Sequence, residues 1–131
     1  IAAQLNGDFT QAKAYEETIA YLQSSPAPDV VYCENDNMCF GVMQALDERG
    51  IAYGDGGVTL ISFDAGRTAL SYCKDGKIDL CAECNPLHGP RVRALIEQLA
   101  RGETPEKLSY MPEALFTADT LTAELLESRG Y

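Results

Sequence analysis

Three short apolar runs in this chain each end on a polar side chain that has the chemistry to bind a ligand. These side chains are Asn35, Asp64 and Glu83, and they follow the runs at residues 30–33, 58–63 and 78–82. A carboxylate accepts hydrogen bonds, whereas the amide of an asparagine both donates and accepts them. A sugar hydroxyl also does both, so this set of groups suits a polyol. Because two of the three groups are acidic and would repel a phosphate, we expect the polyol to be neutral.

The order of the elements explains why these three side chains should lie together. Short runs rich in β-branched residues alternate with helical stretches, which is typical of βαβ units and of parallel strands. Parallel strands place their carboxyl ends on one edge of the sheet, where open α/β folds bind ligands. We therefore expect Asn35, Asp64 and Glu83 to converge on one cleft. Arg67 opens the helix expected after Asp64, which makes it a further candidate for ligand contact.

Local signals predict where the elements begin and end. The expected helices cover about residues 10–24, 38–49, 67–74 and 90–101, and a last helix follows Asp119. The expected helix caps are Asp8 or Thr10, Asp36 and Asp119. Extended segments are expected at Ile1–Gln4 and at residues 108–116. The second of these should be an edge or crossing strand, because Pro112 interrupts it.

The composition is that of one globular domain with an acidic surface. The chain has 131 residues, 46% of them hydrophobic and 23% charged, and its net charge is −10 at pH 7. Nucleic acids and anionic membranes are bound by basic faces, so neither is an expected partner. No apolar run approaches the roughly 20 residues of a membrane helix, and no signal-peptide pattern opens the chain.

The five cysteines are interpreted as small hydrophobic core residues. Cys81 and Cys84 match C-x-x-C, yet they fall at the end of an expected strand, where residues three apart point to opposite faces. An odd number of cysteines also leaves at least one without a partner in the chain. We therefore expect no metal and no cofactor. The single histidine, His88, has no serine or cysteine placed to form a catalytic triad, so we expect no catalysis.

Taken in order, the segments resemble a known family of binding proteins. The matching stretches are Asn6-Gly7-Asp8-Phe9, Glu34-Asn35-Asp36-Asn37-Met38, Ile61-Ser62-Phe63-Asp64 and Asn85-Pro86 with Gly89. They resemble the second lobe of type I periplasmic sugar-binding proteins of ABC transporters, which share their fold with ribose-binding proteins and lactose-repressor-type effector domains. The stretches similar to the galactofuranose-binding branch are Phe9-Thr10, Gly89-Pro90, Thr104-Pro105-Glu106-Lys107-Leu108 and Arg129-Gly130-Tyr131.

The resemblance implies a three-layer α/β fold, with a parallel sheet and helices on both of its faces. It implies that Asn35, Asp64 and Glu83 hold the hydroxyls of a monosaccharide between two lobes. It also implies an extracytoplasmic protein, in the periplasm or at the cell surface as a lipoprotein, which serves the membrane subunits of a sugar importer. In this arrangement residues 1–84 form the ligand-facing core, and residues 85–131 form a hinge-crossing helix and strand with a returning last helix.

Compared with that family, the chain supplies one lobe of two and begins one β–α unit late. The strand before Ile1 belongs in the middle of the family's sheet, so we expect an open slot there, unless the segment 108–116 occupies it. The helix at about 90–101 has no second lobe to cover, which leaves an apolar stripe exposed at Val92, Leu95, Ile96 and Leu99. Open strand edges and uncovered apolar surface favour association, so we expect a homodimer or a swapped assembly.

Two other functions stay open at this point. The first is the effector domain of a lactose-repressor-type transcriptional regulator, which uses the same cleft. The second is a small flavodoxin-like enzyme that uses Asp64 or the cysteines, although the sequence offers no nucleophile–base pair. A helix-turn-helix in the full gene product would indicate the regulator, and turnover by the purified protein would indicate the enzyme.

Overall fold

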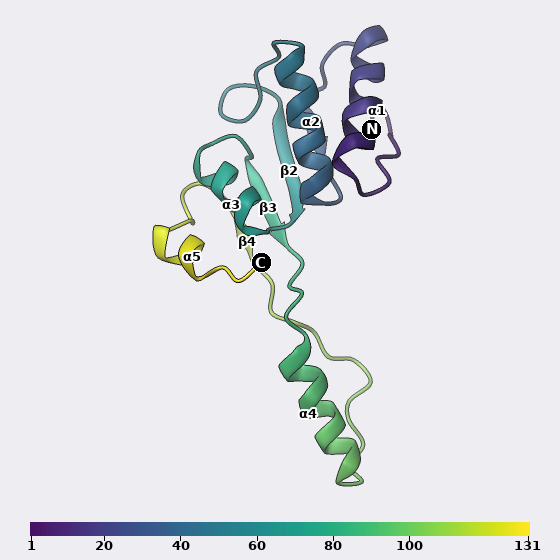
Figure 1. Cartoon of the computed structure of the whole chain (residues 1–131), viewed down its shortest axis with the longest axis vertical. Coiled ribbons are helices and arrows are strands. Elements are labelled where there is room, and N and C mark those ends of the chain that lie inside the picture. Colours follow the sequence, from purple (N-terminus) through teal and green to yellow (C-terminus); the bar gives the residue numbers. More distant parts are fainter.

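The computed structural model describes all 131 residues and shows an α/β body from which one helical arm projects (Figure 1). The sheet has four strands in the spatial order β1 (Val30–Tyr32), β2 (Thr59–Asp64), β3 (Leu80–Glu83) and β4 (Leu115–Phe116). The first three strands are parallel, and β4 runs antiparallel to β3. The α/β class predicted from the sequence is confirmed, and so is the parallel arrangement of the three strands that carry the candidate residues.

Five helices accompany the sheet, and two of them cover one of its faces. The helices are α1 (Gln11–Ser24), α2 (Asp36–Glu48), α3 (Arg67–Lys74), α4 (Gly89–Ala100) and α5 (Ala123–Ser128). Ser62 of β2 bonds to Asp36 of α2, and Cys81 of β3 donates to the carbonyl of Ala69 in α3. Because Ser62 and Cys81 are partners in register, α2 and α3 lie on the same face of the sheet.

Exposure differs sharply between the two faces of the sheet. On the face beneath α2 and α3, Leu60, Cys81 and Phe116 are 0 to 7% exposed and belong to the main hydrophobic core. On the opposite face, the apolar side chains at the sheet edges, Tyr32 and Leu115, are 58% and 65% exposed. These residues therefore leave apolar sheet surface open to solvent.

The first residues do not form the strand that was expected at Ile1–Gln4, so this prediction was wrong. A strand needs a hydrogen-bonded neighbour, and β1, the outermost strand on this side, makes no ladder with them. A groove of about 500 Å³ lies between the segment at residues 1–9 and β1. Its walls are largely apolar and include side chains of α1 and α2, among them Ala14, Met38 and Val42. This groove lies at the β1 edge of the sheet, and the segment 108–116 does not fill it, because its strand β4 pairs with β3 at the other edge.

The helix caps agree with the sequence at one position and differ at two. The Thr10 side chain accepts from the Lys13 amide and caps α1, as expected. Asp36 does not cap α2, because Asn35 takes that place and Asp36 becomes the first helical residue. Asp119 does not cap the last helix either. Thr122 does so, and its hydroxyl accepts from the Leu125 amide.

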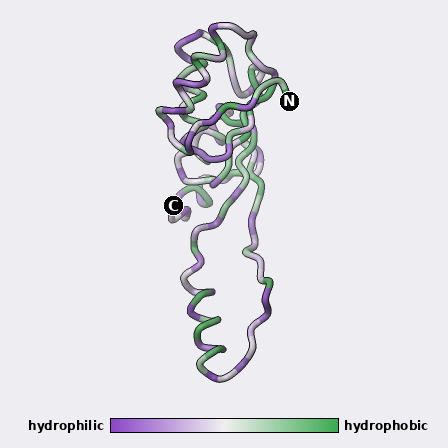
Figure 2. Tube along the Cα trace, turned by 90° about the vertical axis from the view of Figure 1, so that its right-hand side faces the viewer, coloured by the Kyte–Doolittle hydropathy of each residue, from purple (hydrophilic) through white to green (hydrophobic).

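The arm consists of residues 85–114 and projects from the sheet in both views (Figures 1 and 2). The arm begins after β3, contains α4, and returns to β4 as an extended segment. None of the residues of α4 is buried, and Val92, Ile96 and Leu99 are at least half exposed. The exposed apolar stripe predicted for this helix is confirmed at these three positions, and the fourth, Leu95, is partly exposed.

Four of the five cysteines lie in the interior, at positions 33, 39, 73 and 81, as expected for small hydrophobic residues. Cys84 differs, because it is exposed at the end of β3. None of the helices is both long enough and apolar enough to cross a membrane.

Candidate functional site

Asn35 is held at the start of α2 by both ends of its amide. Its Oδ1 accepts from the Met38 amide at 2.8 Å, and its Nδ2 donates to the Phe9 carbonyl at 3.1 Å. Capping explains the first bond, since the free N–H groups of a helix N-terminus need acceptors. The second bond ties α2 to the loop before α1. Each end of the amide still has hydrogen-bonding capacity for a ligand.

Asp64 ends β2 beside the same helix terminus. Partial burial raises the pKa of its carboxylate, and the nearby backbone amide of Asp36 acts in the opposite direction. Its φ is +98° and that of Ala65 is +56°, a backbone region that non-glycine residues rarely adopt. Each such residue costs about 1–3 kcal/mol and persists where its surroundings hold it. Asp64 therefore lies near the first turn of α2, the helix that Asn35 caps.

The Asp36 side chain links neighbouring elements and is almost fully buried. It is 8% exposed, and its two carboxylate oxygens accept from the Ser62 hydroxyl at 2.5 Å and from the Gly66 amide at 2.8 Å. Burial raises its pKa, and these two hydrogen bonds oppose that shift. Its contacts join α2, β2 and the turn before α3, which fixes the frame in which Asp64 stands.

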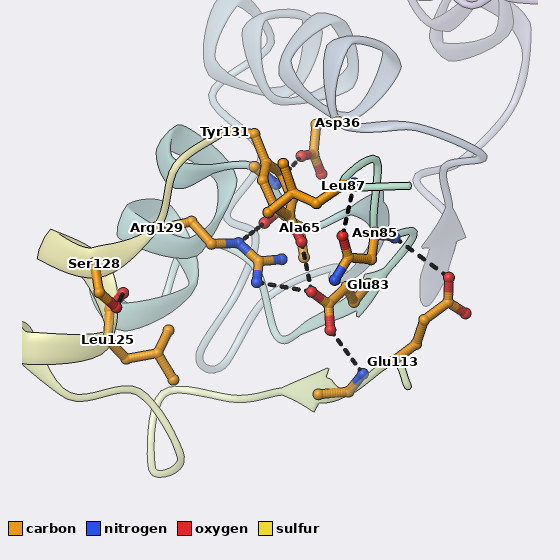
Figure 3. Close-up of polar contacts among 12 residues, drawn as sticks. Asp36, Ala65, Glu83, Asn85, Leu87, Glu113, Leu125, Ser128, Arg129 and Tyr131 are labelled. Carbon is orange, nitrogen blue, oxygen red and sulfur yellow. Dashed lines mark hydrogen bonds and ion pairs between the residues drawn. The ribbon is translucent and has the colours of Figure 1, made fainter. Parts of the chain in front are cut away.

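Glu83 reaches the same edge of the sheet, as the partner of Asp64 in the register of β2 and β3. Its Oε1 accepts from Arg129 Nη1 at 2.8 Å and from the Tyr131 hydroxyl at 2.5 Å, and its Oε2 accepts from the Ala114 amide at 3.0 Å (Figure 3). Burial acts to raise the pKa of Glu83, but these hydrogen bonds and the Arg129 charge outweigh it and lower the pKa. Burial and the bond to Glu83 raise the pKa of Tyr131 to about 12.

Arg67 begins α3, also at this edge. Its guanidinium donates to the carbonyls of Glu127 and Arg129, each at 3.1 Å, and its backbone amide donates to the Tyr131 carbonyl at 2.8 Å. The structure thus brings all four predicted residues to one edge, where Glu83 and Arg67 both bind the segment 127–131. Whether each contacts a ligand stays a prediction.

Phe9, whose backbone carbonyl bonds to Asn35, carries an exposed aromatic ring. Phe9 is 62% exposed, and its carbonyl is the acceptor for the Asn35 amide. Its φ of +54°, next to +48° at Asp8, places it on a tight turn. The Asn-Gly-Asp sequence before Phe9 is a turn signal that could have indicated this exposure.

The chemistry of the edge is that of polar recognition. It offers an amide, carboxylates and an exposed ring, and no group of three or more histidine, cysteine or acidic side chains is arranged to hold a metal ion. The sequence profile of the periplasmic binding protein domain matches residues 1–100. The chain belongs to the periplasmic binding protein domain family.

Individual relatives within this family bind furanose sugars. The chain is 31% identical over 129 residues to the galactofuranose-binding protein YtfQ of Escherichia coli (strain K12), covering 95% of this chain and 40% of that protein. It is 32% identical to a Mycobacterium smegmatis protein solved in complex with β-D-fucofuranose, with a TM-score of 0.82 over 91% of this chain and 39% of that one.

A third relative is the periplasmic binding protein component of the arabinose ABC transporter from Shewanella sp. ANA-3, bound to α- and β-L-arabinofuranose. It is 26% identical and has a TM-score of 0.86, over 99% of this chain and 43% of that one. The chain therefore spans less than half the length of each of these relatives.

Proposed function

We propose that this chain is a lobe of the substrate-binding component of a sugar ABC importer, and that it binds a neutral monosaccharide in its furanose form without catalysing a reaction. The placement of Asn35 as the cap of α2, and of Asp64 at the end of β2 near the same helix start, carries the proposal. The family membership and the furanose complexes of two relatives support it. Because the named relatives include an importer component, the importer is favoured over a transcriptional regulator.

Each group of the site has a role that suits a sugar. The Asp64 carboxylate accepts from one or two hydroxyls, and the Asn35 amide both donates and accepts. The exposed ring of Phe9 offers an apolar surface to the C–H face of the sugar. Glu83 and Arg67 lie at the same edge of the sheet, and both already bond to the segment 127–131. To bind the sugar, each would exchange part of this bonding for a hydrogen bond to the ligand. Two carboxylates at this rim oppose an anionic ligand.

The strength of binding implies a second lobe. Hydrogen bonds to charged groups contribute about 1.5–3 kcal/mol each, whereas association costs about 4–15 kcal/mol. A single lobe should therefore bind a sugar weakly, and closure of two lobes about a hinge supplies the remaining contacts. The exposed arm at residues 85–114, with hinge crossings near residues 84–89 and 115–119, is the part that would reach the other lobe. The closed form would then be recognised by the membrane subunits of the transporter, outside the cytoplasm.

The exposed apolar surface supports a second proposal, which concerns assembly of this 131-residue chain by itself. The groove beside β1, the open sheet face with Tyr32 and Leu115, and the stripe on α4 are all uncovered. Surfaces of this kind favour association, so we propose that the isolated chain forms a homodimer or a swapped assembly. Light scattering at micromolar concentration should give about twice the monomer mass. A single monomeric species would contradict this.

The test of the sugar site is calorimetric titration of the full-length protein with a panel of furanoses and pyranoses. The Asp64→Asn variant should lose about tenfold or more in affinity for the sugar that binds best, because it exchanges a charged acceptor for a neutral one. Asp55→Asn is the matched control, since Asp55 is exposed in the turn that precedes β2, at the other end of that strand. Absence of binding to every sugar, or equal affinities for both variants, would contradict the proposal.

A further inference from the structure

The backbone turn at residues 64–66 is bonded by groups from other segments of the chain. The carbonyl of Asp64 accepts from the Cys84 amide at 3.3 Å, and the Gly66 amide donates to Asp36 Oδ2. Between them, the carbonyl of Ala65 accepts from Arg129 Nε at 3.0 Å. Arg129 lies 64 residues further along the chain, so a distant segment fixes one of the two residues with positive φ.

Arg129 is itself held on several sides. Its Nη1 forms the ion pair with Glu83, and its guanidinium lies 4.1 Å from the centre of the Tyr131 ring and 5.3 Å from that of Phe116. The side chain is 11% exposed, and that of Glu83 is 8% exposed. Figure 3 shows that the guanidinium bridges the Glu83 carboxylate and the Ala65 carbonyl. Since a planar guanidinium presents its donors at fixed angles, these two bonds fix the carbonyl of Ala65 relative to β3.

The segment that carries Arg129 is anchored beside the same turn. We call residues 127–131 the latch. Arg67, two residues after Ala65, binds carbonyls at both ends and in the middle of the latch through its guanidinium and its backbone amide. Ala65 is fully buried beneath this arrangement. The latch and the turn therefore form one connected unit at the carboxyl edge of the sheet.

We propose that Arg129 is a positioning residue for the sugar site, which acts by holding the turn at residues 64–65 so that the Asp64 carboxylate faces the start of α2. Arg129 does not need to touch the sugar for this. The inference rests on the proposed function for the role of Asp64, but the mechanical part of it, that Arg129 holds the turn, stands on the contacts alone. The two parts can be tested separately.

The affinity test combines Arg129→Lys with Asp64→Asn in the full-length protein. Lysine keeps the positive charge beside Glu83 but cannot also reach the Ala65 carbonyl with a planar pair of donors. We expect Arg129→Lys to lower sugar affinity about tenfold, and the double variant to bind no more weakly than Asp64→Asn alone, because both act on the same carboxylate. Arg49→Lys, at the exposed C-terminal end of α2 and away from the site, is the matched control and should bind normally. Additive losses, or no loss, would overturn the proposal.

Hydrogen exchange of the ligand-free full-length protein tests the mechanical part, even if no sugar binds. Arg129→Lys should speed exchange of the Cys84 and Gly66 amides at least tenfold more than that of the Cys33 amide, which bonds in the β1–β2 ladder. Equal acceleration at all three would show that Arg129 supports only global stability, and would overturn the inference. Should Arg129→Lys not fold, Tyr131→Phe, which removes one bond to Glu83, serves in both tests with a smaller expected effect of about threefold.

Discussion

Replacement of Glu83 by alanine should be among the most destabilising single changes in this protein. The change removes the acceptor for Arg129 Nη1, for the Tyr131 hydroxyl and for the Ala114 amide. Both members of the ion pair are almost fully buried. Removal of one partner from a buried ion pair typically costs about 3–5 kcal/mol, which is a large part of the roughly 5–15 kcal/mol by which domains are stable. With a urea dependence of about 2 kcal/mol per molar, the midpoint should fall by about 2 M.

The chain contains a matched control for this experiment. Glu103→Ala also removes one negative charge and one arginine partner, but the side chains of Arg101 and Glu103 are 56% and 50% exposed. An exposed pair contributes about 0–1 kcal/mol, so the urea midpoint should hardly move. Both variants are measured by urea unfolding of the full-length protein, followed by far-ultraviolet circular dichroism. Equal losses for Glu83→Ala and Glu103→Ala would refute the reasoning that burial makes the Glu83 pair strong.

The pH dependence of the same variant gives an independent check. The pKa of Glu83 is lower in the folded protein than its ordinary value of 4.5. The folded protein therefore binds this proton less tightly than the unfolded chain, so the stabilisation is present above pH 4.5 and is lost as the pH falls through the folded pKa. The difference between wild type and Glu83→Ala should shrink in that acidic range. A difference that stays constant would contradict the lowered pKa.

Two further predictions concern α2. Burial raises the pKa of Asp36 above 3.8, so the folded protein binds this proton more tightly than the unfolded chain, and the free energy of unfolding should fall as the pH rises from 3.8 through the folded pKa. Urea unfolding at several pH values should show this fall of the unfolding free energy in wild type but not in Asp36→Asn. Identical pH dependences in the two proteins would contradict the raised pKa of Asp36. Gly41→Ala should cost about 1–3 kcal/mol by overpacking, because a Cβ would lie 2.2 Å from the Gln11 carbonyl of α1. Gly89→Ala is the control, because its Cβ would meet no atom within 4 Å. Its melting temperature in calorimetry should lie within a few degrees of that of wild type. Equal melting temperatures for Gly41→Ala and Gly89→Ala would contradict the close contact at Gly41.

The convergence of the site could be predicted because it follows from a general rule about parallel strands. Once residues 30–33, 58–63 and 78–82 are recognised as parallel strands, their carboxyl ends must share an edge. Asn35 caps α2, Asp64 lies near the start of that helix, and Glu83 stands in register with Asp64. This part of the site needed no knowledge of side-chain packing.

The structure differs from the sequence-based expectations where contacts with residues far along the chain determine the role of a residue. Asn35 and Asp36 are both good helix caps by type, and the sequence does not show that Ser62 and Gly66 will bind the Asp36 carboxylate from 26 and 30 residues away. The ion pair of Glu83 with Arg129 spans 46 residues and has no local signal at all. Ile1–Gln4 was expected to be a strand, but a strand is completed by its neighbour and not by its own residues.

The root of the arm has a mechanical consequence. Its outgoing and returning stretches are fastened together at their base, since the Glu83 amide donates to the Ala114 carbonyl and the Ala114 amide donates to the Glu83 side chain. The two stretches of the arm should therefore move together relative to the sheet when a force acts on the end of the arm that carries α4. The carboxylate at this base also bonds to Arg129, so one side chain joins the root of the arm to the latch.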